Sequence, residues 1–189
     1  MKKGLLIIMS GPSGVGKGSI RERIINDPEL NLVFSISMTT RAPRGQEQNG
    51  VEYFFVDPKT FEEKIAKGEL LEWAKFVDNY YGTPRAYVEK LLEEGKNVFI
   101  EIEVNGAKQI MDKYRGKDAF SIFILPPSFE ELEQRIRGRK TDSDEKIRLR
   151  LARAELEISR QNEYDYRVVN DDLDRCANEI KHIILERMK

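Results

Sequence analysis

Histidine and cysteine are almost absent from this sequence of 189 residues, which contains one of each, His182 and Cys176. A single cysteine excludes an internal disulfide framework, and no second histidine or cysteine is present to complete a metal site of nitrogen and sulfur ligands. The chain also has almost no net charge, because 32 Lys and Arg residues are balanced by 33 Asp and Glu residues. The chain as a whole therefore has no field that attracts polyanions, and we expect neither nucleic acid nor a membrane as a partner.

Long apolar runs are also missing. The start of the chain, Met1-Lys2-Lys3-Gly4, leads into only six residues of strand-like sequence, 5–10, before glycines begin. Such a run is too short for the core of a signal peptide or for a membrane-spanning helix. We therefore expect a cytoplasmic protein, and its length suits one compact domain.

What the sequence does contain is a glycine-rich turn between a predicted buried strand, 5–10, and a predicted helix, 19–25. In such a turn consecutive backbone N–H groups converge on one point, the following helix offers its positive N-terminal end, and a lysine adds a full charge. This arrangement is typical of loops that bind the phosphates of a nucleoside triphosphate. The residues expected to do so are Gly11, Pro12, Ser13, Gly14, Val15, Gly16, Lys17, Gly18 and Ser19.

One position departs from the Gly-x-x-x-x-Gly-Lys-[Ser/Thr] pattern. Gly18 stands where a hydroxyl normally helps to hold Mg²⁺, and Ser19 comes one residue late. We therefore expect no dedicated set of protein ligands for the metal, which would be held by nucleotide oxygens, waters and a distant carboxylate. An unrelated glycine-rich turn is the alternative explanation of the motif.

The order of the remaining segments predicts an α/β fold, in which helices wrap a parallel sheet. A different style of sequence between residues 39 and 82, with polar loops and turn signals at Asn49-Gly50 and 79–82, predicts an inserted subdomain. The expected core strands are 5–10, 33–37, 97–102, 120–125 and 167–169, and the expected helices are 19–25, 105–114, 128–139, 145–163 and 172–188. Within the insert we expect strands at 53–56 and 70–77 and a helix at 58–67.

Two arginines in the insert, Arg41 and Arg44, lie three residues apart on a short loop stiffened by Pro43. Two guanidinium groups at this spacing can fork around one phosphate, and Tyr53 and the pair 80–81 can add phenolic donors. An ordinary solvated loop is the alternative.

Glu72 interrupts a mostly apolar predicted strand, where a carboxylate needs a partner. Guanine presents N1–H and the N2 amino group side by side and matches a carboxylate, whereas adenine has an acceptor at N1. A charged hydrogen bond of this kind is worth roughly 1.5 to 3 kcal/mol, a discrimination of about tenfold to a hundredfold.

The segment 97–103 is predicted to be a strand that delivers Glu101 and Glu103 on one face at its C-terminal end, where ligands of α/β sheets collect. They could orient hydrated Mg²⁺ or contact an acceptor nucleotide. An ion pair with a nearby cation is the alternative.

Eight cations flank a polar break at 141–144: Arg135, Arg137, Arg139, Lys140, Lys146, Arg148, Arg150 and Arg153. A salt-bridged surface is the ordinary explanation of such a cluster. Because a phosphate loop is present in the same chain, we favour a lid that closes over a migrating phosphoryl group.

These segments together resemble the guanylate kinases. The matching stretches are SGPSGVGK at 10–17, SMTTRAPR at 37–44, NGVEY at 49–53, EWA at 72–74, NYYGT at 79–83, EIEVNGA at 101–107, PPS at 126–128 and VNDD at 169–172. The resemblance implies a P-loop NTPase type of fold with a core of residues 1–34, 84–137 and 151–189, a GMP-binding insert at 35–83 and a helical lid at 138–150.

The resemblance also implies an activity, transfer of the terminal phosphoryl group of ATP to GMP, and to dGMP, in purine metabolism. The implied GMP-binding residues are Ser37, Arg41, Arg44, Tyr53, Glu72, Tyr81, Thr83 and Glu103, with Glu101 beside them. The cations expected at the migrating phosphoryl group are Lys17, Arg44, Arg135, Arg139 and Arg150, and Asn170 would lie near the adenine. Glu103 stands where the family often has Asp.

Two other functions are consistent with parts of the sequence. A kinase of another small acceptor, such as AMP or a sugar phosphate, would share the phosphate loop, but Ser37 and Glu72 argue against it. A non-catalytic module that binds protein partners would share the fold, but such modules tend to lose the Gly-Lys loop and the phosphate-binding arginines, which are present here.

Overall fold

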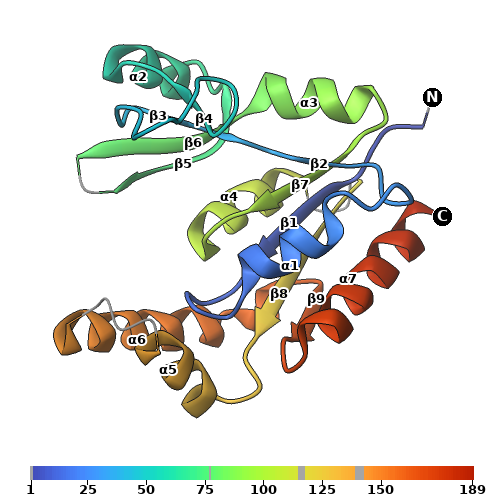
Figure 1. Ribbon diagram of the computed structural model, residues 1–189. Helices are drawn as coiled ribbons and strands as arrows, with labels where there is room; N and C mark the ends of the chain where they lie inside the picture. The colour runs from blue at the N-terminus through green and yellow to red at the C-terminus, as the bar shows by residue number, and fades with distance from the viewer. Residues whose placement is uncertain (1, 77, 115–117, 139–142) are drawn as a thin grey trace.

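The computed structural model describes residues 2–76, 78–114, 118–138 and 143–189 (Figure 1). A five-stranded parallel sheet lies at its centre, with the strand order β2-β7-β1-β8-β9. This sheet, flanked by helices, confirms the predicted fold class. The strands are β1 (Leu6–Ser10), β2 (Leu32–Phe34), β7 (Asn97–Glu101), β8 (Ala119–Leu125) and β9 (Tyr166–Val169).

Residues of β1 alternate between the two faces of this sheet, as the pleat of a strand requires. Ile7 and Met9 belong to the core under helices α1 (Lys17–Ile24) and α7 (Leu173–Met188). Leu6 and Ile8 belong to the opposite core, under α3 (Arg85–Glu93) and α4 (Val104–Tyr114). Burial on both faces explains why this strand is apolar throughout.

A second sheet has the strand order β4-β3-β6-β5 and packs with helix α2 at one end of the molecule (Figure 1). Its small core is made by Met38, Phe61 and Leu70. The elements are β3 (Ser37–Thr39), β4 (Tyr53–Phe55), α2 (Pro58–Ala66), β5 (Leu70–Phe76) and β6 (Asn79–Pro84).

Two local predictions were wrong, and one helix was missed. The single strand expected at 33–37 is divided, because β2 ends at Phe34 in the parallel sheet and Ser37 begins β3 in the other one. The turn expected at 79–82 is part of β6; Gly82 is there because a Cβ would come within 2.8 Å of the Glu72 carbonyl oxygen. Helix α3 was missed, although apolar residues at 87, 88, 91 and 92 follow a helical spacing.

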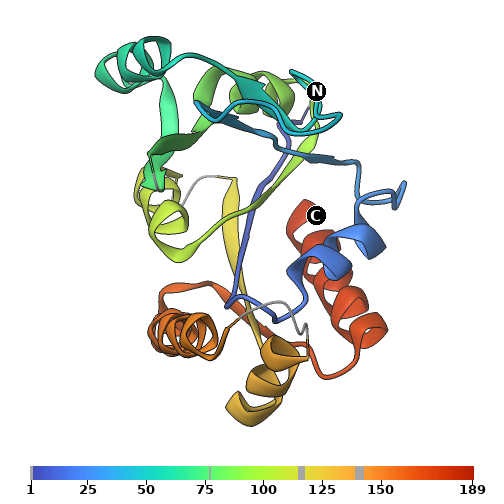
Figure 2. The same cartoon turned by 60° about the vertical axis from the view of Figure 1, so that its left-hand side comes forward.

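Helices α5 (Phe129–Arg137) and α6 (Asp144–Ser159) lie at the end of the molecule opposite α2 (Figure 2). The helix expected at 145–163 ends at Ser159 and is followed by a 3₁₀ turn, η1 (Gln161–Glu163). Of the polar break expected at 141–144, residues 141 and 142 are outside the described residues, while Ser143 caps α6 and Asp144 begins it. No helix in the part of the chain that the structure describes has the length and apolarity needed to cross a membrane.

Candidate active site

The glycine-rich loop connects β1 to α1 and is held from beneath by Asn170. The Asn170 side-chain amide donates to the Val15 carbonyl at 2.8 Å, and the residue is buried. Gly16 has φ of 101°, and a Cβ at this position would lie 2.6 Å from Asn170 Nδ2. Only glycine fits both the backbone conformation and the close approach.

Lys17 begins α1, and its side chain turns back over the loop. Its Nζ donates to the Gly11 carbonyl at 2.5 Å and to the Pro12 carbonyl at 3.1 Å. Beside it is a cleft of about 460 Å³, which we call the phosphate cleft. The cleft is lined by Gly11, Ser13, Lys17, Glu101, Ile102, Glu103, Arg150, Arg153 and Glu157.

Arg150 of α6 reaches the glycine-rich loop directly, since its Nη2 donates to Ser13 Oγ at 2.6 Å. Arg135 of α5 lies farther back, where its Nη2 bonds Glu131 at 2.7 Å and the Asn170 carbonyl at 3.0 Å. The structure thus brings one predicted lid arginine to the loop and holds the other beside Asn170. The third, Arg139, lies outside the described residues.

Arg41 is the centre of a cluster of polar and aromatic groups in the insert. Its guanidinium makes two bonds to the Glu47 carboxylate, at 2.9 and 3.0 Å, and lies 5.2 Å from the centre of the Tyr53 ring. Tyr53 and Tyr81 meet edge to face, with ring centres 6.3 Å apart. The hydrogen bonds to Glu47 raise the pKa of Arg41, to which Tyr81 adds a smaller contribution, and the Arg41 bond lowers the pKa of Glu47.

The bidentate bond between Arg41 and Glu47 is the geometry in which a guanidinium also binds a phosphate. Arg44 is exposed near the same carboxylate, to which its backbone N–H donates at 2.8 Å. Three predicted phosphate-binding side chains, Arg41, Tyr53 and Tyr81, are therefore together. Sequence analysis missed Glu47, because a glutamate in a polar loop carries no pattern.

A second hollow, of about 520 Å³, lies between the parallel sheet and the insert, and we call it the acceptor hollow. Ser37 and Tyr53 line it, as does Ser35, whose buried Oγ has no hydrogen-bond partner among the described residues. The full lining is Arg21, Ile25, Phe34, Ser35, Ile36, Ser37, Glu47, Val51, Glu52, Tyr53 and Glu101. Glu101 lines both hollows, so they adjoin at the end of β7.

Glu72 is a buried carboxylate in β5, only 4% exposed. Its Oε1 accepts a hydrogen bond from Thr83 Oγ1 of β6 at 2.7 Å. Burial raises the pKa of Glu72 to about 7, and the nearby Glu103 carboxylate acts in the same direction. The structure thus brings together three residues that were predicted to surround one base.

The expectation that Glu101 and Glu103 share a strand face was wrong, since β7 ends at Glu101. Glu101 pairs with Arg21 of α1 at 3.2 Å, the ion pair that sequence analysis had left as the alternative. Glu103 accepts from the backbone N–H groups of Asn105 at 3.0 Å and Gly106 at 2.6 Å, at the start of α4. A carboxylate at this place caps the helix and interacts well with its dipole.

Arg153 and Glu157 also line the phosphate cleft; sequence analysis grouped Arg153 with the cations of a lid and gave Glu157 no role. They lie four residues apart on α6 and form an ion pair of 3.0 Å, with Glu157 buried. Their spacing shows only that they share a helix face. Nothing in the local sequence indicated which face points into the cleft.

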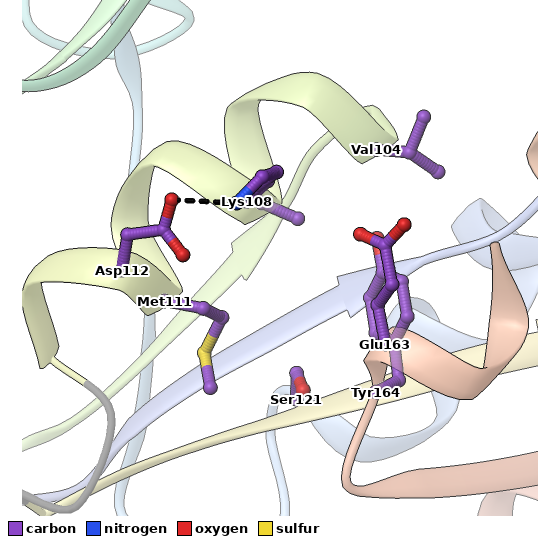
Figure 3. Close-up of a pocket in the computed structure, with 8 residues that line it drawn as sticks. Val104, Lys108, Met111, Asp112, Ser121, Glu163 and Tyr164 are labelled. Atoms are coloured by element: carbon purple, nitrogen blue, oxygen red, sulfur yellow. Dashed lines mark hydrogen bonds and ion pairs between the residues drawn. The ribbon is translucent and has the colours of Figure 1, made fainter.

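A smaller hollow, of about 190 Å³, lies between α4 and the η1 segment (Figure 3). Lys108 and Asp112 form an ion pair of 2.7 Å at its side, and Glu163 and Tyr164 border it. Its lining includes neither the glycine-rich loop nor any predicted nucleotide-binding residue. We therefore assign the candidate site to the two larger hollows.

Comparisons with known proteins agree with this geometry. The family model described as "Guanylate kinase" matches residues 3–187. Guanylate kinase from Malacoplasma penetrans is 51% identical over 187 residues, which cover 99% of this chain and 95% of that protein. Guanylate kinase from Zymomonas mobilis is 50% identical over 190 residues, covering 100% of this chain and 87% of that protein. The crystal structure of guanylate kinase from Anaplasma phagocytophilum superposes with a TM-score of 0.73 at 35% identity, covering 100% of this chain and 89% of that one. The chain belongs to the guanylate kinase family.

Proposed function

We propose that this protein transfers the terminal phosphoryl group of ATP to GMP, giving ADP and GDP, in the cytoplasmic supply of guanine nucleotides. The observation that carries the proposal is the pair of adjoining hollows, which share Glu101 in their linings. One is lined by the glycine-rich loop and Lys17, and the other by Ser37 and by Glu47 and Tyr53 of the Arg41 cluster. Membership of the guanylate kinase family supports the same reaction.

In this proposal the insert, residues 35–83, binds GMP. The Arg41 cluster, with Arg44, Tyr53 and Tyr81, holds the GMP phosphate, and Ser37, Glu72, Thr83 and Glu103 surround the base, with Glu101 between the two hollows. A carboxylate at Glu72 accepts from guanine N1–H and the N2 amino group, a pair of donors that adenine lacks. The buried position strengthens this discrimination, because an unmatched charge there would be left without a partner.

The chemistry is direct transfer between two aligned phosphates. The attacking oxygen of GMP is already anionic, so no general base is needed, and the rate comes from alignment and charge neutralisation. Lys17, Arg44, Arg135, Arg139 and Arg150 supply the neutralising charge. Residues 138–150 act as a lid that excludes water and so prevents hydrolysis of ATP. Residues Gly11 to Ser19 cradle the ATP phosphates, and Asn170 supports the loop and the adenine end of the site.

Mg²⁺ is expected to accompany ATP, and the residues of the phosphate cleft fit an ion bound largely by phosphates and water. Among the described residues, no three His, Cys, Asp or Glu side chains are grouped so that they could hold a metal. Gly18 contributes no hydroxyl, but Glu101 and Glu103 line the cleft and can bond the waters of a hydrated ion. The ion supplies further neutralisation of phosphate charge when bound.

A coupled assay of ADP release tests the proposal with ATP, Mg²⁺ and one monophosphate at a time. We expect GMP to be the best acceptor, with dGMP used as well and AMP used poorly. A higher rate with AMP or a sugar phosphate would overturn the assignment of the acceptor. No turnover with any acceptor, by a folded protein, would favour a non-catalytic binding module instead.

A further inference from the structure

Strand β5, which carries Glu72, is an edge strand of the second sheet, and its open side faces helix α4. Its pairing with β6 is irregular next to Glu72, because the register shifts between Leu70 and Glu72. The ladder of backbone hydrogen bonds therefore fixes Glu72 from one side only. An edge strand with such an irregularity needs another restraint if its side chains are to hold a fixed position.

Helix α4 provides that restraint through Gln109. The Gln109 Oε1 accepts from the Trp73 backbone N–H at 3.1 Å, and its Nε2 donates to the Trp73 carbonyl at 3.1 Å. A carboxamide offers the same donor and acceptor as a peptide group. Gln109 thus satisfies the strand edge at Trp73 as the backbone of a further strand would.

A second contact from the same helix lies on the other side of Glu72. Lys113 Nζ donates to the Leu71 carbonyl at 2.7 Å. Gln109 and Lys113 are four residues apart and therefore share one face of α4. Together they bond the backbone at the two neighbours of Glu72, Leu71 and Trp73.

Gly106 completes this face of α4, one turn before Gln109. A Cβ at Gly106 would lie 3.1 Å from Glu72 Oε2 and 2.4 Å from the Ile102 side chain. The Glu72 carboxylate therefore lies directly against the first turn of the helix. A shift of β5 along α4 would move this carboxylate relative to the proposed position of the guanine base.

We propose that Gln109 is a positioning residue for guanine recognition: by bonding both backbone groups of Trp73, it fixes β5 on α4 and holds the Glu72 carboxylate in place for the base. The inference rests on the proposed function, in which Glu72 reads guanine. Gln109 itself touches no nucleotide. Its effect is on selectivity for the acceptor and not on ATP or on the transfer step.

The test replaces Gln109 with Met, which has a similar size and no amide. We expect the ratio of kcat/KM for GMP to that for IMP, which lacks the N2 amino group, to fall about three- to tenfold, the scale of one lost pair of hydrogen bonds. The KM for ATP should be unchanged. Lys108→Met is the matched control, because Lys108 is the adjacent residue, bonds Asp112 and makes no hydrogen bond or ion pair with β5 among the described residues. It should leave the ratio unchanged.

A double-mutant cycle shows whether Gln109 acts through Glu72. Glu72→Gln alone should lower the GMP to IMP ratio strongly, and adding Gln109→Met to it should lower the ratio no further. An equal effect of Gln109→Met in both backgrounds, or no effect in the wild-type background, would overturn the inference. An unchanged ratio in Glu72→Gln would instead refute the role of Glu72 in the proposed function.

Folding is followed by circular dichroism and thermal unfolding. If Gln109→Met does not fold, Gln109→Asn serves in its place, since its amide is one carbon too short to reach both backbone groups of Trp73. The same fall in the ratio of kcat/KM for GMP to that for IMP is expected. Wild-type selectivity in a folded Gln109→Asn protein would contradict the proposal.

Discussion

Replacing Glu72 by Gln is expected to stabilise the nucleotide-free protein while weakening its binding of GMP. The Glu72 carboxylate is 4% exposed, and burial raises its pKa to about 7 from the usual 4.5. An amide has nearly the same shape and can still accept the bond that Thr83 Oγ1 donates at 2.7 Å. It carries no charge, so the cost of burying a carboxylate is removed.

The size of the effect follows from the difference between the two pKa values. The folded protein retains this proton up to about pH 7, whereas the unfolded chain releases it near pH 4.5. At about 1.4 kcal/mol for each unit, the difference corresponds to roughly 3 kcal/mol of unfolding free energy. Because the folded pKa is the higher one, the wild-type protein loses this stability as pH rises from about 4.5 to about 7. The advantage of Glu72→Gln should therefore grow over that window and be complete above pH 7.

Urea unfolding of both proteins between pH 4 and pH 9 measures this directly. Glu69→Gln is a suitable control, because Glu69 is exposed and its bond to Lys64 lowers its pKa. Removing the Glu69 charge should slightly lower the unfolding free energy, the opposite of the effect expected for Glu72→Gln. Calorimetry at pH 8 should show GMP binding to Glu72→Gln weakened about tenfold to a hundredfold, with ATP binding unchanged. The reasoning is refuted if Glu72→Gln is less stable than wild type at pH 8, or if the difference is the same at every pH.

Other predictions concern single residues of the proposed active site. Lys17→Met should lower kcat at least about a hundredfold while circular dichroism stays native, and normal turnover would refute its role. Asn170→Ala leaves the buried Val15 carbonyl without its donor, so we expect a loss of about 1–3 kcal/mol in urea unfolding and a higher KM for ATP but not for GMP. Arg41→Gln should raise the KM for GMP at least roughly tenfold in steady-state assays, and an equal rise for ATP would contradict a role at the acceptor phosphate. Finally, kcat/KM for GMP should fall as pH drops below about 7, because Glu72 takes up a proton, and the fall should be smaller for Glu72→Gln, in which the nucleotide phosphates still titrate but this carboxylate is absent.

The parts of the site that could be predicted are those in which one short segment carries both the shape and the chemistry. The apolar strand, the glycines and Lys17 are consecutive, so the loop between β1 and α1 could be derived from local conformational rules. The parallel sheet could also be derived, because its central strands β1, β7 and β8 are mostly apolar and the strands alternate with helices. The grouping of Glu72 with Thr83 and Glu103 came from the family resemblance, and the structure brings these residues together. Their roles toward nucleotides remain predictions.

Errors arose where local signals were ambiguous. Asn79 and Gly82 resemble a turn, yet they lie in β6, and Gly82 is required by the close approach of β5. Helix α3 follows Pro84 and is only nine residues long, so its periodic signal was easily overlooked. The roles of cations and carboxylates were even harder to predict, because a charged residue in a polar segment is as consistent with a solvent-exposed face as with a binding site.

The sequence by itself determined the glycine-rich loop, the α/β class and the family, since each depends on residue order along a continuous stretch. Only the tertiary structure decided which distant groups complete one another: Asn170 beneath Val15, Arg21 beside Glu101, and Gln109 along the backbone of Trp73. These pairs are separated by 155, 80 and 36 residues in the chain. A hydrogen bond requires its two atoms within about 3 Å, and that proximity is set by how the helices pack on the sheets, which no local pattern specifies.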